Sequence, residues 1–378
     1  MKLLCVFIAF VLSFFIGQSI VIKLYVFSYR RRLFDSVDAR KTHTGLIPRI
    51  GGMAFLPTQC SIFLLIIIIL RHFNVIQVDY QVLSQFLLLI MGLGILFVTG
   101  IVDDFVGVYY KWKFAAQFVA ALLLPITGLW IHHLDGLLWM TVLPGWFGIL
   151  LTICVVVFII NAFNMIDGLD GLCSGLTILA CTVFGTLFFR HESWLPVIFS
   201  FITVGALAPF FYYNVYGKTK RKRRIFMGDT GSMTLGLTVA FLAIRYTSGD
   251  PSEPSPDGNL LVAFSPVLVP MFDVVRVVAI RFINRKPLFL PDKEHIHHYF
   301  LRLGFSKTTT LFSILGIAFG FIVFNMCLSR FVFNNHNIIL ILDAIIYFGG
   351  LWLLGRVKHP RVESVTPEVP IESIQHED

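Results

Sequence analysis

The segment 161–171, NAFNMIDGLDG, holds a dense set of side chains able to bind a phosphate or a metal ion. Its two Asn and two Asp follow directly after an apolar run, 150–160. Polar and ionisable side chains are costly at the end of a membrane helix, so such a cluster indicates a functional site. The alternative is a solvated turn, because Asn, Asp and Gly are ordinary turn residues. For this segment alone the two interpretations are equally supported.

A pair of carboxylates, Asp103-Asp104, ends another apolar run, VTGIVDDF. Adjacent carboxylates in partly dehydrated surroundings repel each other, which raises the pKa of at least one unless a cation joins them. The pair therefore indicates a metal-phosphate site or a base, against the alternative of two helix-end carboxylates in water. Lys113, nearby in sequence, places an ammonium within reach of an anionic ligand, although taken alone it also fits an ordinary positive-inside anchor.

The segment 228–232, GDTGS, opens a predicted helix. Free backbone N–H groups at a helix start, with Gly allowing close approach, suit a phosphate. Asp229 fits a plain N-cap equally well. Phe226, just ahead of the segment, could stack on a base, or it could simply face the core or lipid.

The sequence His295-Ile296-His297-His298 has the composition of a zinc site. No Cys or carboxylate partner completes a tetrahedral set, however, so zinc is not favoured. Histidine donors in a basic loop favour contacts with a phosphate or a sugar instead.

The composition is that of a polytopic membrane protein. Of 378 residues, 57% are hydrophobic, 39 are Phe and only 14% are charged. The net charge of +8 would suggest nucleic acid in a soluble protein, but membrane topology explains it better, and no nucleic-acid partner is expected. The six cysteines lie mostly in apolar segments with no CxxC pair, which indicates core residues and neither a disulfide framework nor a metal site.

Runs of roughly 20 apolar residues mark spanning helices. The sequence predicts an all-α integral membrane bundle of about 11 transmembrane helices, over residues 3–27, 53–70, 82–101, 114–131, 144–160, 173–190, 194–212, 232–247, 259–281, 309–328 and 337–355. The first run is too long for a signal-peptide core and is expected to be retained. Residues 1–355 form the predicted catalytic domain, and the polar segment 356–378 a disordered cytoplasmic tail.

The distribution of Lys and Arg predicts an external N-terminus and a cytoplasmic C-terminus. Loops on one side hold Arg71, Arg190 and Arg330, whereas the alternate loops hold far more basic residues, including Arg30–Arg32, Lys111, Lys113, the run KTKRKRR at 218–224, Arg285 and Lys286. With this topology all four polar clusters face the cytoplasm. A transporter or channel would place ionisable groups near the middle of the bilayer. Chemistry at the cytoplasmic membrane surface is therefore favoured over transport.

Taken together, the clusters indicate phosphoryl transfer. Carboxylates and Asn carbonyls are hard oxygen ligands that suit Mg²⁺ bridged by substrate phosphates, and Mn²⁺ is expected to substitute. Catalysis of phosphoryl transfer is largely positioning and neutralisation of charge. A lipid phosphate as one reactant would explain why the site lies at the bilayer.

The chain resembles the polyprenyl-phosphate N-acetylhexosamine-1-phosphate transferase superfamily, in glycosyltransferase family 4. The resemblance covers about residues 30 to 305 and rests on five ordered motifs: Lys41-x-His43 with Pro48-Arg49-x-Gly51-Gly52, Asp103-Asp104 with Lys113, NAFNMIDGLDG, FMGDTGS and PDKEHIHHYFLRLG. The HIHH form is similar to the bacterial undecaprenyl-phosphate GlcNAc-1-phosphate transferases. A departure is Gly107, where eukaryotic members carry Asn.

The resemblance implies that undecaprenyl phosphate attacks the sugar-linked phosphorus of UDP-GlcNAc, releasing UMP and forming undecaprenyl-diphospho-GlcNAc for cell-surface polysaccharide such as O-antigen. It places the protein in the bacterial inner membrane, with the active site facing the cytoplasm, and leaves a homodimer open. Another UDP-N-acetylhexosamine or UDP-MurNAc-pentapeptide is the alternative donor within the class. A non-catalytic lipid carrier or transporter is the alternative from a different class.

The resemblance also implies residue roles. Asp229 and Asn164 would bind Mg²⁺, supported by Asn161 and Asp167, while Asp103 and Asp104 would lie beside the lipid phosphate and Lys113 would neutralise its charge. The remaining expected substrate contacts are Lys41, His43, Asp170, Phe226, His295, His297 and His298.

Three intramembrane features have structural interpretations. Asp273 and Arg276 are three residues apart and are expected to pair on one helix face. Pro266 and Pro270 predict a bend or break, which could leave a groove for the prenyl chain. Asp343 has no obvious partner.

Outside the membrane segments, the basic run at 218–224 is expected to anchor its loop to anionic lipid.

Overall fold

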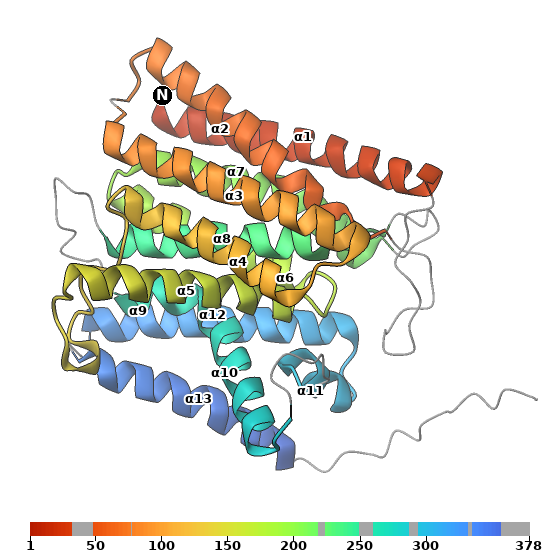
Figure 1. The fold of residues 1–378 in the computed structure, drawn as a ribbon, viewed down its shortest axis with the longest axis vertical. Coiled ribbons are helices and arrows are strands. Elements are labelled where there is room, and N and C mark those ends of the chain that lie inside the picture. Colours follow the sequence, from red (N-terminus) through yellow and green to blue (C-terminus); the bar gives the residue numbers. More distant parts are fainter. Residues whose placement is uncertain are drawn as a thin grey trace, which may run out of the picture.

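The computed structural model describes residues 1–31, 48–76, 78–217, 224–248, 260–286, 294–331 and 335–356 (Figure 1). These residues form helices, with a single isolated bridge between His133 and Val142, so the predicted all-α class is confirmed. The α-helices are α1 (Lys2–Arg31), α2 (Phe55–His72), α3 (Tyr80–Val106), α4 (Tyr110–Ile126), α5 (Gly145–Ile166), α6 (Leu172–Arg190), α7 (Trp194–Tyr216), α8 (Gly228–Thr247), α9 (Leu260–Phe264), α10 (Leu268–Ile283), α11 (Ile296–Arg302), α12 (Lys307–Phe331) and α13 (His336–Arg356). Short 3-10 helices are η1 (Gly51–Ala54), η2 (Leu137–Trp139) and η3 (Ser265–Val267).

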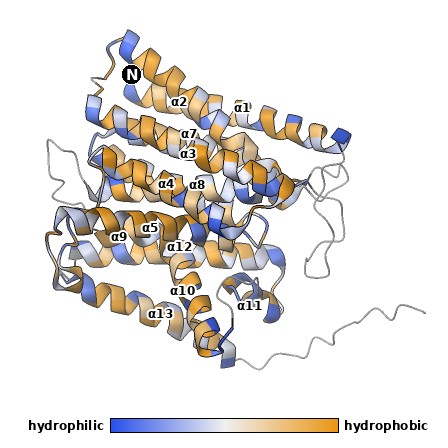
Figure 2. Ribbon diagram, in the orientation of Figure 1, coloured by the Kyte–Doolittle hydropathy of each residue, from blue (hydrophilic) through white to orange (hydrophobic). Residues whose placement is uncertain are grey.

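The protein is a multi-pass membrane protein. Every predicted spanning segment overlaps a helix, although the predicted segment 114–131 runs past the end of α4 at Ile126. Nine helical segments in the described part of the chain are long and apolar enough to cross a bilayer. The two that fall short are α4, with 17 residues, and α8, which is less apolar. Hydrophobic residues dominate along the helices, and hydrophilic ones gather toward their ends (Figure 2). The number of passes and the orientation across the membrane stay predictions.

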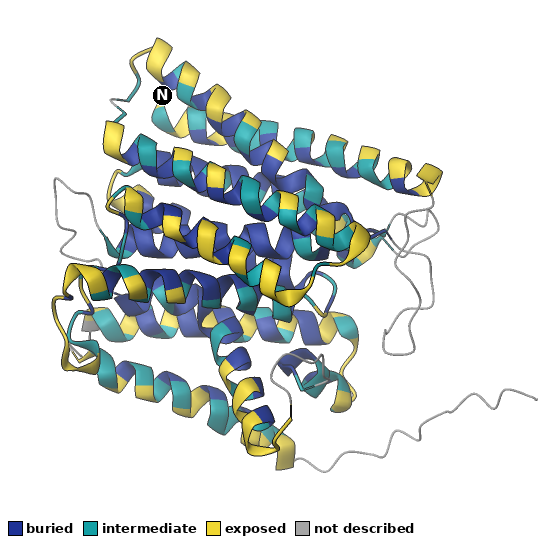
Figure 3. Ribbon diagram, in the orientation of Figure 1, coloured by how far each residue is buried: buried dark blue, intermediate teal, exposed yellow. Residues whose placement is uncertain are grey.

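Helix α8 is the central helix of the bundle. From Gly228 to Tyr246 every residue except Asp229 is buried, and α3, α5, α6, α9 and η1 surround the helix (Figure 3). A helix covered on all sides by protein needs no lipid-facing apolar surface. This explains how α8 can contain three Gly, four Thr and one Ser and still lie inside a membrane protein.

Glycines allow the start of α8 to lie against its neighbours. A Cβ atom on Gly100 of α3 would clash with the backbone of Thr230, whose nitrogen would be 2.7 Å away. A Cβ on Gly52 of η1 would lie 2.7 Å from the carbonyl oxygen of Met227. The two glycines therefore set the depth at which α8 begins between α3 and η1.

Backbone hydrogen bonds hold the segment around η1 to the residues just before α8. Phe226 N donates to Pro48 O at 2.8 Å, and Gly51 N donates back to Phe226 O at 2.9 Å. Gly52 N donates to Met227 O at 2.8 Å. The Pro-Arg-x-Gly-Gly motif, residues 48–52, thus packs beside the first turn of α8.

The predicted break at Pro266 and Pro270 is confirmed, because η3 interrupts the helical segment between α9 and α10. After the break α10 turns away from the direction of its neighbours (Figure 1). The predicted pair also forms, with Arg276 Nη2 donating to Asp273 Oδ1 at 2.9 Å. A prenyl groove beside α10 stays a hypothesis.

The sequence showed no obvious partner for Asp343, and the structure supplies one. Asn325 Nδ2 of α12 lies 3.1 Å from each carboxylate oxygen of Asp343 on α13. Both side chains are fully buried, so the pair joins two helices that are otherwise largely apolar. The tail beyond Arg356 lies outside the described residues, as does the basic run apart from Arg224.

We expect Gly100→Ala to lower the thermal unfolding temperature of the purified protein, because overpacking costs about 1–3 kcal/mol. Gly94→Ala is the matched control: Gly94 lies on the same helix and its Cβ would meet nothing within 4 Å. The control should be neutral or slightly stabilising, since Ala is the better helix former. Equal unfolding temperatures for the two variants would contradict the packing assigned to Gly100.

Candidate active site

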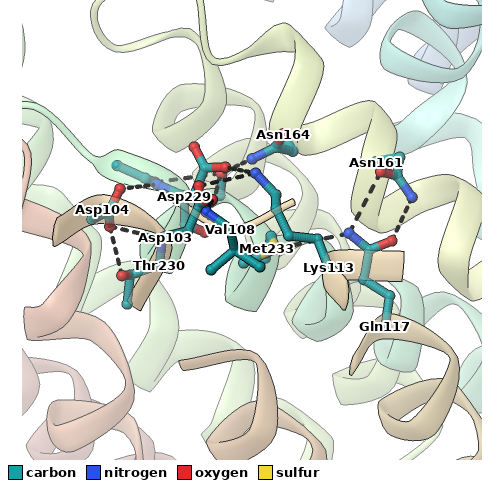
Figure 4. A network of polar contacts seen from close by, with 12 residues as sticks. Asp103, Asp104, Val108, Lys113, Gln117, Asn161, Asn164, Asp229, Thr230 and Met233 are labelled. Atoms are coloured by element: carbon teal, nitrogen blue, oxygen red, sulfur yellow. Dashed lines mark hydrogen bonds and ion pairs between the residues drawn. The ribbon is translucent and has the colours of Figure 1, made fainter. Parts of the chain in front are cut away.

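Lys113 joins two carboxylates that come from different helices. Its Nζ donates to Asp103 Oδ2 at 3.0 Å and also to Asp229 Oδ2 (Figure 4). Asp103 lies in the last turn of α3, Lys113 in the first turn of α4 and Asp229 in the first turn of α8. All three side chains are 15–20% exposed, so the cluster is largely shielded from solvent yet still accessible. Residues 116 positions apart thus share one ionic centre.

Asp104, the other carboxylate of the pair, caps α8. Its Oδ1 accepts from Asp229 N at 2.8 Å, and its Oδ2 accepts from Thr230 N at 3.1 Å and from Thr230 Oγ1 at 2.6 Å. The free N–H groups at the start of a helix require such acceptors. Gly228, with φ of 75°, lies so close that a Cβ there would be 2.6 Å from Asp104 Oδ2. The two neighbouring carboxylates therefore have different partners, one facing Lys113 and the other the backbone of α8.

The two Asn of the 161–171 segment lie one turn apart near the end of α5. Asn164 Nδ2 donates to Ser232 Oγ in α8 at 2.9 Å. Asn161 Nδ2 donates to Gln117 Oε1 in α4 at 2.6 Å and to Val157 O at 2.8 Å. The end of α5 is thereby joined to the same two helices, α4 and α8, that carry Lys113 and Asp229.

Gln117 was not predicted as part of this site. It lies one turn after Lys113 on α4, so both side chains face α5 and α8. A polar residue four positions from a candidate lysine, in an otherwise apolar segment, was the available signal.

Asp167 lies at the C-terminal end of α5, half-buried. Burial raises the pKa of this carboxyl well above its usual range, and the nearby Asp229 carboxylate raises it further, whereas Arg49 opposes the shift. Arg49 also lies near Asp229, with Nη2 3.8 Å from Oδ1. Arg49 stands in a motif that the sequence singled out, but its role as a counter-ion at this site was missed.

Asp170 and Phe226 meet through Arg224, which the sequence assigned to a lipid-anchoring run. The Arg224 guanidinium pairs with Asp170 Oδ2, and its carbon lies 5.3 Å from the centroid of the Phe226 ring. Asn214 supports the arrangement from α7, accepting from Gly171 N at 2.5 Å and donating to Ile225 O at 2.8 Å. The structure thus corrects the assignment of Arg224, which is an ion-pair partner of the 161–171 segment.

The histidine cluster lies against the 161–171 segment. A Cβ on Gly168 would be 2.5 Å from His297 Nε2, so the imidazole packs directly on that backbone. His297 is buried, and neither of its ring nitrogens has a hydrogen-bond partner among the residues that the structure describes. Burial beside His298 and His295 lowers its pKa to about 3. The ring centroid of His298 is 4.2 Å from that of His297, whereas His295 Nδ1 lies 2.8 Å from Asp273 Oδ2. His297 is therefore a neutral ring at neutral pH.

The donors at this site fit a magnesium ion shared with a substrate phosphate. Asp103 and Asp229 already present oxygens to one shared cation, Lys113 Nζ, and Asn164 contacts the first turn of α8 beside them. In the described part of the chain, no three His, Cys, Asp or Glu side chains converge as a complete metal set. Mg²⁺ commonly takes one or two carboxylates together with water and substrate phosphates. Lys41 and His43, also expected to bind substrate, lie outside the described residues.

The different partners of Asp103 and Asp104 lead to a prediction about stability. Asp104→Ala should lower the thermal unfolding temperature more than Asp103→Ala. Loss of Asp104 strands two backbone N–H groups and a hydroxyl at the start of α8, each worth about 1–3 kcal/mol when buried and unpaired. Loss of Asp103 leaves Lys113 still paired with Asp229. Unfolding of both purified variants, followed by intrinsic fluorescence, tests this, and a larger loss for Asp103→Ala would contradict it.

The chain has recognisable relatives among characterised protein families. Residues 86–247 match the family model described as glycosyl transferase family 4. The undecaprenyl-phosphate alpha-N-acetylglucosaminyl 1-phosphate transferase of Escherichia coli K12 is 31% identical over 278 residues, covering 73% of this chain and 71% of the relative. The protein of the same description from Yersinia pestis is 28% identical over 309 residues, covering 81% and 78%. A probable undecaprenyl-phosphate N-acetylglucosaminyl 1-phosphate transferase of Bacillus subtilis is 29% identical over 293 residues, covering 76% and 75%.

The matched region contains the Asp103–Lys113–Asp229 cluster, the 161–171 segment and all of α8. The resemblance predicted from the motifs is confirmed, and the chain belongs to glycosyl transferase family 4.

Proposed function

We propose that this protein transfers N-acetylglucosamine-1-phosphate from UDP-GlcNAc to undecaprenyl phosphate, releasing UMP and forming undecaprenyl-diphospho-GlcNAc. The observation that carries the proposal is the contact of Lys113 with both Asp103 and Asp229, at the point where the ends of α3, α4 and α8 meet. The names of the relatives support the same lipid acceptor and sugar phosphate.

In the proposed reaction, an oxygen of the lipid phosphate bonds to the sugar-linked phosphorus of the donor, and the bond from that phosphorus to the bridging oxygen breaks. UMP carries that oxygen and the electron pair away. A phosphate monoester is largely dianionic at neutral pH, so the acceptor needs little help from a base. Lys113 and Arg49 are placed to offset the negative charge of the reacting phosphates, which is a large part of catalysis in phosphoryl transfer.

Mg²⁺, with Mn²⁺ as a substitute, is the proposed cofactor. Asp229 and Asn164 would hold it, with Asn161 and Asp167 supporting that end of α5, and Asp103 and Asp104 would lie beside the lipid phosphate. When bound, the ion would neutralise charge on the diphosphate. Asp103 and Asp229 already share one cationic group, the Lys113 ammonium, which supports a cation site at these two carboxylates.

The donor is proposed to extend from this ionic centre along the 161–171 segment. Asp170 and Phe226, joined through Arg224, form an aromatic and ionic surface suited to the uracil ring. His297 borders the same segment at Gly168, and His295, His297 and His298 would contact the sugar and the diphosphate. Lys41 and His43 are proposed to act on the lipid side.

We further propose that the protein lies in the bacterial inner membrane with this site at the cytoplasmic face. The basic residues gathered in alternate loops support that orientation. UDP-sugars would reach the site from the cytoplasm, and the product would serve cell-surface polysaccharide synthesis.

The function is tested by a transfer assay on the purified full chain in detergent, with undecaprenyl phosphate, Mg²⁺ and a panel of UDP-sugars radiolabelled in the sugar. We expect labelled lipid from UDP-GlcNAc, with UMP as the released nucleotide. Release of UDP would mean transfer of the sugar without its phosphate and would contradict the proposed bond cleavage. Preference for another UDP-sugar would replace the donor, and silence with every donor in folded protein would favour a non-catalytic lipid carrier.

In the same assay we expect Asp229→Asn to lower kcat by more than about 100-fold. Loss of an outer-sphere partner of a metal ion costs up to about 100-fold, and loss of a direct ligand should cost more. Chelation of divalent cations should abolish transfer by the unmodified chain, and added Mg²⁺ should restore it. Asp79→Asn is the matched control, because Asp79 caps the opposite end of α3 and Asn is an equally good N-cap. Near-normal turnover by folded Asp229→Asn would overturn the assignment of this carboxylate to the metal.

A further inference from the structure

Asp273 is a second buried carboxylate, separate from the Lys113 cluster, and it accepts hydrogen bonds from three different parts of the fold. It is 0% exposed and lies in α10, one and a half turns after the break at η3. Oδ1 accepts from Arg276 Nη2 at 2.9 Å and from Ile296 N at 2.9 Å, and the Tyr347 hydroxyl of α13 is 3.5 Å away. Oδ2 lies 2.8 Å from His295 Nδ1.

Such a carboxylate is costly unless its neighbours compensate it. An ionised group inside a membrane protein is expensive, and those present pair with one another and lie at functional positions. Arg276 supplies the opposite charge, and its Nη2 also donates to Glu294 O. The ion pair with Arg276 is enough to balance the negative charge of Asp273. The further hydrogen bonds to His295 and Ile296 therefore indicate that Asp273 has a second role.

That task is to hold the segment 294–296 at the start of α11. Three consecutive residues are attached to the Asp273–Arg276 pair: Glu294 by its carbonyl, His295 by its ring and Ile296 by its amide. Helix α11 has only seven residues and cannot be stable by its own hydrogen bonds. Its position therefore depends on these anchors and on packing against neighbouring helices.

The anchored segment leads directly into His297 and His298, and His297 borders the candidate active site. His297, two residues after His295, lies against the backbone of Gly168, which is next to Asp167. The rings of His295 and His297 are nearly parallel, with centroids 6.0 Å apart. A displacement of segment 294–296 would move this whole face of the site.

We propose that Asp273 is a positioning residue that acts through His295, orienting the histidine cluster toward the diphosphate-sugar part of the donor. The bond to Nδ1 fixes the orientation of the imidazole and makes Nε2 the ring nitrogen that meets the ligand. The inference rests on the proposed function. It assigns a role to a residue that the sequence analysis interpreted only as the ion-pair partner of Arg276 on one helix face.

The test compares Asp273→Asn, His295→Gln and the double variant in the transfer assay with UDP-GlcNAc, together with hydrogen–deuterium exchange of the peptide spanning 294–302. The matched control is Asp343→Asn, the same change at another fully buried carboxylate, which binds Asn325 of α12. We expect Asp273→Asn to reduce kcat/KM for UDP-GlcNAc about 100-fold, as misplacement of a positioning group does. KM for undecaprenyl phosphate should be unchanged, and exchange in 294–302 should accelerate.

The double variant separates positioning through His295 from an independent effect. If Asp273 acts through His295, Asp273→Asn should cause less than about a twofold further loss in the His295→Gln background, because residues in one network are not additive. Losses that multiply, retention of wild-type kcat/KM by Asp273→Asn, or an equal loss in Asp343→Asn would each overturn the proposal.

Two further measurements keep the test decisive. If Asp273→Asn does not fold, the comparison is made between His295→Asn and His295→Gln. The amide of His295→Asn can still reach Asp273, so hydrogen–deuterium exchange in 294–302 should be slower in this variant than in His295→Gln. Equal exchange in the two variants would overturn the proposal. If the unmodified chain transfers no label, the proposed function fails on its own. The exchange comparison then still decides whether Asp273 anchors the segment.

Discussion

A charge buried at the end of a membrane helix must be paired, and the site depends on this constraint. Asp103, Asp229 and Lys113 reach one point from α3, α8 and α4, and each would be costly there without the others. The requirement joins three helices at one end of the bundle. It also leaves partly shielded charge of both signs at the place where phosphates and a metal ion are proposed to enter.

The same end of the bundle shows how closely fold and site are connected. Helix α8 is enclosed by protein along nearly its whole length, so the position of Asp229 is set by packing rather than by a loop. Asp104 caps that helix while its neighbour Asp103 faces Lys113. One turn of α3 thus both fixes the start of α8 and supplies a charge to the site, which is why an adjacent pair of carboxylates is needed.

A second buried carboxylate repeats this logic at the edge of the site. Asp273 stands on a helix that departs from its neighbours after a proline break, and Arg276 balances its charge. Its remaining bonds are given to the segment that carries the histidines. The rigid centre, made of helix ends, and the histidine cluster, carried by a short helix, are therefore held by the same kind of interaction.

The sequence alone determined the membrane class, the helical segments and the family, because each of these depends on local properties: apolar runs, Lys and Arg placement, and ordered motifs. It also singled out Asp103, Lys113 and Asp229 as candidate site residues, and the structure brings these three side chains together. Only the tertiary structure decided that Asp104 caps α8, that Arg224 pairs with Asp170, that Asn325 accompanies Asp343, and that Gln117, Arg49 and Asp273 belong to the networks around the site. These pairings join residues from different helices or loops. Hydropathy and spacing describe one segment at a time, whereas the partner of a buried polar group is set by how the helices pack.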